Sequence, residues 1–222
     1  MFRESGSVGQ AGGRAESSAS GGLDGEQKAL LRKLILEKRR ALSGQERRKK
    51  SLAIQERLLR LKEFKQGRVI HLFLSFRGEV ITDGIVKKAL ALGKRVVVPV
   101  VSREPDKLIF SELIRYPEDV EPSTLGIPEP KKEFIRKVDI STIDLFVLPG
   151  VAFDAQGHRL GYGAGYYDRN LGKAAQRRVS GKVSLIALAF ELQVVDCIPP
   201  SVHDVQVHKI VTEERVIECR SA

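Results

Sequence analysis

The residues with the clearest chemical potential lie in one short stretch, residues 159–169, which reads RLGYGAGYYDR. It holds three glycines, three of the four tyrosines of the chain and an aspartate between two arginines. Glycines let a backbone approach phosphates closely, and a helix that starts behind them offers unpaired N–H groups to an anion. Arg159 adds a guanidinium that can bind two phosphate oxygens at once. The stretch is therefore a candidate phosphate site; the alternative is a tight loop whose tyrosines pack on a sheet.

The spacing of this stretch differs from the two common nucleotide motifs. A dinucleotide fingerprint would place its third glycine at position 166, where the chain has Tyr166. A Walker loop would end in Gly-Lys-Ser/Thr, which is absent from residues 159–169. The phosphate interpretation therefore depends on where the stretch lies in the fold.

A carboxylate follows the glycines and raises the question of a metal. Asp168 lies three residues after Gly165, near the expected start of a helix, where it either favours the positive helix end or holds a metal. Mg²⁺ on a nucleotide is usually held by one or two carboxylates together with phosphate oxygens. The candidate for a second carboxylate is Asp204, in the loop IPPSVHDVQV before the last expected strand.

These residues need a frame, and the hydrophobic pattern predicts one. Apolar, β-branched runs at residues 69–75 and 95–101 flank a helix that begins at Thr82 or Asp83 and ends at Gly93, which is a βαβ pattern. Further strands are expected at residues 107–113, 143–150, 183–190 and 207–213. The runs near 95 and 143 are continuous rather than alternating, which is typical of strands covered on both faces.

We therefore expect an α/β fold, a single three-layer domain with a largely parallel central sheet. In such sheets, ligands bind beyond the carboxyl ends of the strands. The VLPG sequence at residues 147–150 ends a strand just before the glycine-rich stretch, which places residues 159–169 at that edge.

The N-terminal part differs from the rest in composition. Residues 1–25 are rich in Gly, Ser and Ala and are predicted to be a disordered tail, so the domain itself spans residues 26–222. From Glu26, leucines at three- and four-residue spacing predict a helix, and Ser43 with Glu46 forms a capping box that opens a second one. A basic helical hairpin is thus expected before the sheet.

The net charge of +10 is concentrated in this hairpin. Residues 28–65 contain 14 Lys and Arg against 4 Glu, an excess equal to the whole net charge. A solvated helical face explains most such runs, whereas a few of these residues could attract a nucleic acid, a nucleotide or a polycarboxylate. An RNA-binding module is the alternative function, but the patch contains only Phe64 as an aromatic residue and has no RRM signature.

Composition excludes several other classes. No run of 18 or more apolar residues and no secretory signal occur, so we expect a cytoplasmic protein. The two cysteines, Cys197 and Cys219, lack metal-binding spacing and are expected to be reduced. A different α/β enzyme is a second alternative: a sugar-phosphate isomerase would not consume ATP, and a coenzyme A transferase would need a nucleophilic glutamate that the sequence does not identify.

Several separated motifs, in this order, carry a family resemblance: KALLRK, LSFRGEV, GIPEP, LPGVAFDAQGHRLGYGAGYYDR, ALAFELQ and IPPSVHD followed by VTE. Together they cover about residues 27–217 and resemble 5-formyltetrahydrofolate cyclo-ligases, also called 5,10-methenyltetrahydrofolate synthetases. The resemblance implies an ATP- and Mg²⁺-dependent closure of 5-formyltetrahydrofolate to 5,10-methenyltetrahydrofolate, with release of ADP and phosphate. It also implies a cytoplasmic monomer whose folate substrate can carry a polyglutamate tail.

The resemblance also implies roles for individual residues. Catalysis would involve Arg159 and Tyr166, and the metal would be held by Asp168 and Asp204. ATP would be bound by Lys28, Arg32, Arg159, Leu160, Gly161, Tyr162, Gly163, Ala164, Gly165, Tyr166 and Tyr167. Folate would be bound by Leu74, Glu79, Tyr162, Gly163, Ala164, Gly165 and Tyr166.

Two positions depart from the family pattern. Ala164 stands where some relatives carry Lys and others Gly, so a side-chain contact with phosphate or substrate is missing there. Ser201 stands where relatives often have an acid, which changes the expected surroundings of Asp204.

Overall fold

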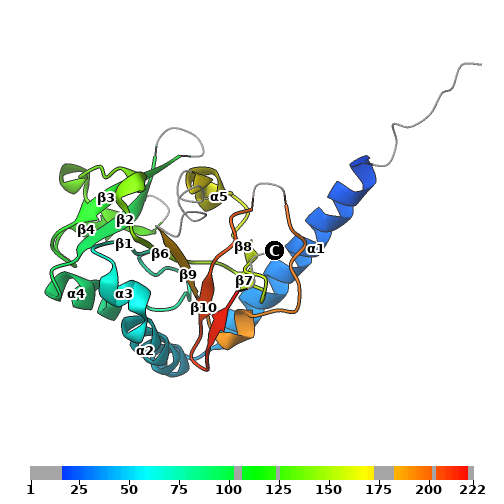
Figure 1. The fold of residues 1–222 in the computed structure, drawn as a ribbon. Helices are drawn as coiled ribbons and strands as arrows, with labels where there is room; N and C mark the ends of the chain where they lie inside the picture. Colours follow the sequence, from blue (N-terminus) through cyan, green and yellow to red (C-terminus); the bar gives the residue numbers. More distant parts are fainter. Residues whose placement is uncertain (1–16, 103–106, 124–125, 173–182, 202–203, 220–222) are drawn as a thin grey trace, which may run out of the picture.

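The structure is a computed structural model that describes residues 17–102, 107–123, 126–172, 183–201 and 204–219; for residues 17–24 it describes the backbone alone. Figure 1 shows a central sheet with helices packed around it. In the described part of the chain, no helix is both long enough and apolar enough to span a lipid bilayer. Cys197 and Cys219 are not joined by a disulfide.

The central sheet has seven strands in the order β11-β10-β9-β6-β1-β2-β3. Their bounds are β1 (Val69–His71), β2 (Arg95–Val101), β3 (Leu108–Leu113), β6 (Leu145–Leu148), β9 (Ser184–Leu188), β10 (Lys209–Val211) and β11 (Val216–Glu218). The five inner strands pair in parallel, and only the edge strands β3 and β11 pair antiparallel. The predicted largely parallel sheet is confirmed.

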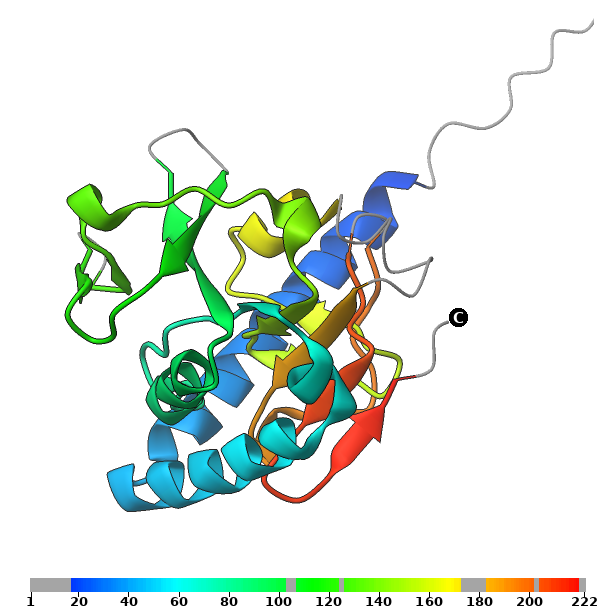
Figure 2. The same ribbon diagram turned by 60° about the vertical axis from the view of Figure 1, so that its left-hand side comes forward.

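Both faces of the sheet are buried, which accounts for the continuous apolar runs. On β2, Val96 and Val98 face one hydrophobic cluster, whereas Val97 faces another. The first cluster is covered by α2 (Gly44–Arg60), α3 (Lys62–Gln66) and α4 (Asp83–Ala91), which lie together on one side in Figure 2. Across the other face run α1 (Ser17–Ala41) and the short helix α5 (Tyr166–Asn170). The three-layer prediction is therefore confirmed.

Smaller elements decorate the rim of the sheet. Two short hairpins, β4 (Val120–Pro122) with β5 (Pro128–Pro130) and β7 (Ala152–Phe153) with β8 (Arg159–Leu160), form separate ladders. Three 3-10 turns are η1 (Lys132–Phe134), η2 (Ile140–Thr142) and η3 (Glu191–Gln193). The β7–β8 hairpin packs under α1 through a small core of its own, and it leads directly into the glycine-rich stretch.

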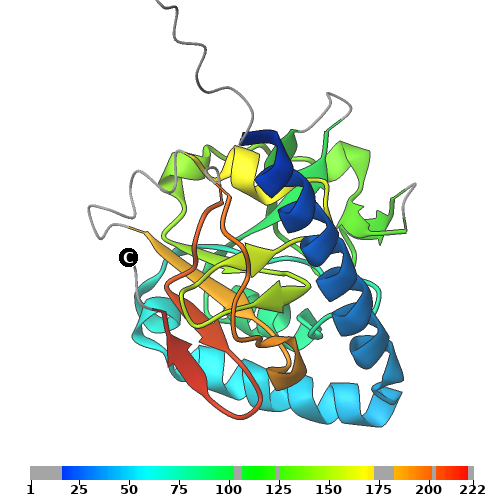
Figure 3. The same cartoon turned by 90° about the vertical axis from the view of Figure 1, so that its right-hand side faces the viewer.

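The N-terminal helices differ in detail from the prediction. Helix α1 begins at Ser17, so residues 17–25 of the predicted disordered tail are helical, and the remaining residues 1–16 lie outside the described part. Extending an existing helix adds one hydrogen bond per residue without a new nucleation cost. A stretch with low helix propensity can therefore be helical when it adjoins a stretch with high helix propensity. The Ser43–Glu46 capping box is confirmed. Figure 3 shows α1 and α2 diverging from the corner where they meet.

Candidate functional site

A pocket of about 540 Å³ opens at the carboxyl edge of the parallel sheet. Leu74 follows β1, Val101 ends β2, and Pro149 follows β6, and all three line the pocket. Most residues that the sequence assigned to ATP, folate or metal lie on its wall: Leu74, Glu79, Arg159, Gly161, Tyr162, Ala164, Gly165, Tyr166, Tyr167 and Asp168. Their placement at the carboxyl edge is the position that the fold class predicts for a ligand.

The glycine-rich stretch forms the connection between β8 and α5. Gly163 has a φ of 110° and Gly165, the residue before α5, has a φ of 63°, a region that residues with a Cβ rarely adopt. The glycines therefore set the path of the loop. Helix α5 has only five residues, so the favourable end of its dipole is weak and anion binding here must depend mainly on side-chain cations.

The backbone requirement at Gly163 gives a first prediction. Gly163→Ala should lower the free energy of unfolding by about 1–2 kcal/mol, because the added Cβ is forced into a strained φ although no atom lies nearby. The matched control is Gly172→Ala, beyond α5, where the space is equally open and φ is ordinary. It should be neutral or slightly stabilising. Urea denaturation of both variants checks this, and equal losses would show that the φ of Gly163 is not needed.

Arg159 is the most deeply held cation of the pocket. Its side chain is 4% exposed, and one terminal nitrogen donates to Asp168 Oδ1 at 2.7 Å. The guanidinium also lies 5.5 Å from the ring centre of Tyr167. Its Nε is buried and has no hydrogen-bond partner among the described residues. A buried donor without a partner is costly, so this nitrogen is suited to an acceptor oxygen of a ligand.

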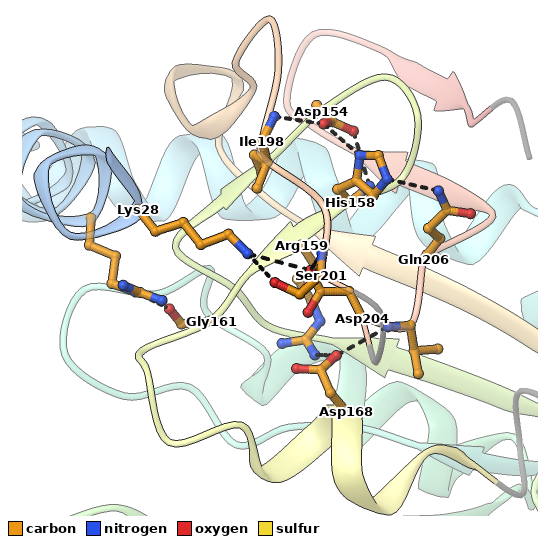
Figure 4. Close-up of polar contacts among 12 residues, drawn as sticks. Lys28, Asp154, His158, Arg159, Gly161, Asp168, Ile198, Ser201, Asp204 and Gln206 are labelled. Atoms are coloured by element: carbon orange, nitrogen blue, oxygen red, sulfur yellow. Dashed lines mark hydrogen bonds and ion pairs between the residues drawn. The ribbon is translucent and has the colours of Figure 1, made fainter. Parts of the chain in front are cut away.

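Asp168 and Asp204 are carried by segments in direct contact (Figure 4). Asp168 Oδ1 accepts a hydrogen bond from the backbone N–H of Val205 at 3.3 Å, which is the residue after Asp204. Asp204 Oδ2 lies 3.7 Å from Lys28 Nζ and accepts from the Ser201 N–H at 2.9 Å. The predicted pair of carboxylates is thus brought to one corner of the site.

The donor set at this corner fits Mg²⁺ held partly by a nucleotide. Within the described segments, no group of three or more His, Cys, Asp or Glu residues could hold an ion alone. Two carboxylates together with phosphate oxygens are nevertheless the usual ligand set for Mg²⁺ at a nucleotide. Asp168 is paired with Arg159 and Asp204 with Lys28, so an ion would share these oxygens with the cations.

Helix α1 delivers its two predicted cations to this corner. Lys28 Nζ donates to Ser201 Oγ at 2.6 Å, and Arg32 Nε donates to the carbonyl oxygen of Gly161 at 2.8 Å. Lys28 and Arg32 are one helical turn apart and therefore share a face, as predicted. Ser201, one of the two departures from the family pattern, uses its hydroxyl to hold Lys28.

The tyrosines divide into different roles. Tyr167 packs edge-on against the buried His71, with ring centres 5.7 Å apart, so the packing alternative explains much of this residue. Burial lowers the pKa of His71 to about 3, so its ring is neutral. Tyr162 is half exposed, and its hydroxyl donates to Glu79 Oε1 at 2.8 Å. Tyr166, the predicted catalytic tyrosine, lies on the pocket wall.

Some of the residues predicted to bind ATP or folate have little side-chain contact with the pocket. The Leu160 side chain packs beneath α1 in the cluster that contains Ile35, so a contact with ATP would involve its backbone. Gly163 and Ala164 are exposed, and the missing side chain at Ala164 leaves the pocket open there. Leu74 is 5% exposed and belongs to the main core as well as to the pocket wall.

Three further site residues were not predicted. Arg39 of α1 donates to the Tyr162 hydroxyl at 2.7 Å, but the sequence offers it only as one of 14 cations. Glu129 lines the pocket, and burial raises the pKa of its carboxyl. The GIPEP motif that contains it was the available signal. Asp154 accepts from His158 Nδ1 and from the Ile198 N–H, both at 2.9 Å, and so ties the β7–β8 turn to the Asp204 segment (Figure 4).

Comparison with known proteins gives a consistent result. Residues 24–213 match the model of the 5-formyltetrahydrofolate cyclo-ligase family. The chain is 32% identical over 199 residues to a probable 5-formyltetrahydrofolate cyclo-ligase of Caenorhabditis elegans, which covers 86% of this chain and 95% of that protein. It is 30% identical over 187 residues to the 5-formyltetrahydrofolate cyclo-ligase of Escherichia coli K12, covering 83% of this chain and all of the relative.

Solved structures agree with the sequence comparison. The NMR structure of Aquifex aeolicus 5,10-methenyltetrahydrofolate synthetase superposes with a TM-score of 0.71 at 31% identity, over 88% of this chain and 94% of that one. A 5,10-methenyltetrahydrofolate synthetase from Mycoplasma pneumoniae gives a TM-score of 0.65 at 26% identity, over 84% of this chain and 98% of that one.

Proposed function

Since the chain belongs to the 5-formyltetrahydrofolate cyclo-ligase family, whose members are enzymes, we propose that it converts 5-formyltetrahydrofolate to 5,10-methenyltetrahydrofolate with ATP and Mg²⁺. The observation that carries the proposal is one pocket whose wall holds two chemically different pairs. Glu79 and Tyr162 form a hydrogen-bonded pair, and Arg159 and Asp168 form an ion pair. The pocket volume is within the range of small-molecule sites, about 300–1,000 Å³.

The proposed reaction needs positioning and charge neutralisation rather than a protein nucleophile. The formyl oxygen attacks the γ-phosphorus of ATP, ADP leaves, and a phosphorylated imidate-like intermediate forms. N10 then attacks the formyl carbon and loses its proton, and phosphate departs with the former formyl oxygen. Each step moves negative charge among oxygen atoms, which cationic side chains can stabilise.

The wall around the Arg159–Asp168 ion pair is suited to the triphosphate. Arg159 would donate its unpaired Nε to a phosphate oxygen, while Lys28 and Arg32 add positive charge from α1. Mg²⁺ held by Asp168 and Asp204 would neutralise and orient the γ-phosphate. Because Arg159 is already fixed by Asp168, little side-chain freedom is lost when ATP binds.

The wall around Glu79 and Tyr162 is suited to the folate. Glu79 presents a carboxylate that can accept N–H groups of an aminopyrimidine ring, and Leu74 supplies an apolar wall. Tyr166 also lines the pocket, where it can border the formyl group during transfer. We propose that the functional unit is a monomer and that it acts in the cytoplasm.

The test is an omission assay. Purified protein is mixed with 5-formyltetrahydrofolate, ATP and Mg²⁺, and methenyltetrahydrofolate is followed by absorbance. Product should form only when all three are present, and EDTA should stop it. No ATP-dependent product from protein that is folded by circular dichroism would refute the proposal.

The basic surface of α1 and α2 gives a second prediction, for polyglutamylated folate. Long-range attraction between this surface and a polyglutamate tail should raise kcat/KM, and salt should screen it. Raising KCl from about 50 to about 200 mM should therefore lower kcat/KM more for a pentaglutamate substrate than for the monoglutamate. Steady-state kinetics on both substrates check this, and equal salt effects would contradict the steering.

A further inference from the structure

Arg39 is a buried cation that has no assigned role. Its side chain is on the inner face of α1 and the residue is 3% exposed. One terminal nitrogen, Nη2, donates to the Tyr162 hydroxyl at 2.7 Å and to the Arg77 carbonyl oxygen at 3.0 Å. The other, Nη1, is buried without a partner among the described residues. A guanidinium stays charged at every accessible pH, so its burial requires a compensating group.

The compensating group is the carboxylate of Glu79, which Arg39 reaches through one hydroxyl. Arg39 and Glu79 line the same small hollow beside Pro149 and Gly150. The Tyr162 hydroxyl accepts from Arg39 and donates to Glu79 Oε1 at 2.8 Å. The second carboxylate oxygen, Oε2, accepts from the Phe76 N–H at 2.9 Å.

The hydrogen bonds from Arg39 to Tyr162 and from Tyr162 to Glu79 fix the orientation of the Tyr162 hydroxyl. With its lone pair facing Arg39, the Tyr162 hydroxyl has its hydrogen directed at Glu79. Charged partners at both ends polarise the two hydrogen bonds in the same sense, which strengthens them. Resting on the proposed function, we propose that Arg39 is a positioning residue of the folate pocket, which orients the Glu79 carboxylate through Tyr162 without touching folate.

The charges around Glu79 support this inference. Burial raises the pKa of the Glu79 carboxyl, and the Tyr162 hydrogen bond, the Phe76 N–H and the charge of Arg39 oppose that rise. Of the other titratable or charged groups nearby, Tyr167 on α5 interacts with the Glu79 charge, Arg77 lines the same pocket with its guanidinium over the Phe76 ring, and Arg47 of α2 reaches the turn at Gly78.

Removal of the Arg39 side chain should raise the pKa of Glu79 further. The positive charge of Arg39 lowers this pKa, and without it the effect of burial is less opposed. Folate binding that needs the ionised carboxylate is present above this pKa and is lost as the pH falls through it. The midpoint of folate affinity against pH should therefore move to higher pH.

The test compares Arg39→Gln with Arg40→Gln, an exposed neighbour on the same helix. Calorimetry measures the Kd of monoglutamyl 5-formyltetrahydrofolate and of a non-hydrolysable ATP analogue over a range of pH. Arg39→Gln should weaken folate about tenfold or more, change the ATP analogue less than about twofold, and move the folate midpoint upward. Arg40→Gln should match the wild type.

Tyr162→Phe covers the case in which Arg39→Gln folds poorly, since it removes the same link and keeps the ring. It should show the same loss of folate affinity and the same displacement of the pH midpoint. The double variant should bind folate no more weakly than the weaker single variant, because both changes break one chain. The positioning role would be overturned if the losses of folate affinity in the two single variants added fully in the double variant. It would also be overturned if the variants lost stability while the pH midpoint of folate affinity stayed unchanged.

The outcome also separates this inference from the proposed function. A wild-type protein that binds no 5-formyltetrahydrofolate refutes the proposed function. Wild-type protein that binds it, with Arg39→Gln and Arg40→Gln indistinguishable from each other, refutes only the role of Arg39.

Discussion

Asp168→Asn is expected to lower kcat by at least about 100-fold, the scale of losing one main electrostatic contact to the transition state. Asp168 is the carboxylate that both anchors Arg159, at 2.7 Å, and faces the pocket beside Asp204. An asparagine keeps the shape and the acceptor oxygen but loses the negative charge that a metal needs. The free energy of unfolding should therefore fall by only about 1–2 kcal/mol.

Kinetics at several Mg²⁺ concentrations, with thermal unfolding in parallel, check this prediction. Excess Mg²⁺ should restore part of the activity of Asp168→Asn, because weaker metal binding is overcome by mass action. The matched control is Asp196→Asn, an exposed aspartate far along the chain, which should change neither property. An Asp168→Asn variant that simply unfolds would show that this carboxylate serves the helix start rather than the metal.

Arg159→Gln should lower kcat by about 100- to 1,000-fold, since it removes the buried donor expected to face the developing charge on the phosphate. The glutamine can still bond to Asp168, so the loop keeps one of its anchors. The kcat of Arg159→Lys should lie between those of Arg159→Gln and the wild type, because lysine restores the charge but not the paired donors of a guanidinium.

The control for this series is Arg60→Gln, at an exposed site whose ion pair with Glu56 is on the protein surface. Such pairs contribute little to stability, so this variant should behave as wild type. The measurement is kcat and KM for ATP in all four proteins. If Arg159→Gln retained activity within tenfold of the wild type, phosphate binding at this residue would be wrong.

The fold was largely readable from the sequence, because its signals are local. Continuous apolar runs predicted the parallel strands, and Ser43 with Glu46 predicted the start of α2. The lengths of the strands were predicted less accurately. The strand expected at residues 69–75 ends at His71, and the turn that follows is at Arg77 and Gly78, both with positive φ. The strand β11 was missed because it is an edge strand of only three residues.

The candidate site was readable only where its residues share one motif or one family resemblance. Residues 159, 161, 162 and 164–168, together with Leu74 and Glu79, line the pocket. Arg39 was not predicted, because its contact with Tyr162 spans 123 residues and nothing in a run of basic residues distinguishes the one that is buried. Asp154 was also not predicted, because its hydrogen bond with the Ile198 N–H joins residues 44 positions apart in the sequence.

The central claim, that ATP activates the formyl oxygen at this pocket, can be measured with an isotope. 5-Formyltetrahydrofolate labelled with ¹⁸O in the formyl group is converted with ATP and Mg²⁺, and the released phosphate is analysed by mass spectrometry. The account predicts that each methenyltetrahydrofolate formed is matched by one phosphate carrying the label. Unlabelled phosphate, or product formed without ATP, would contradict it.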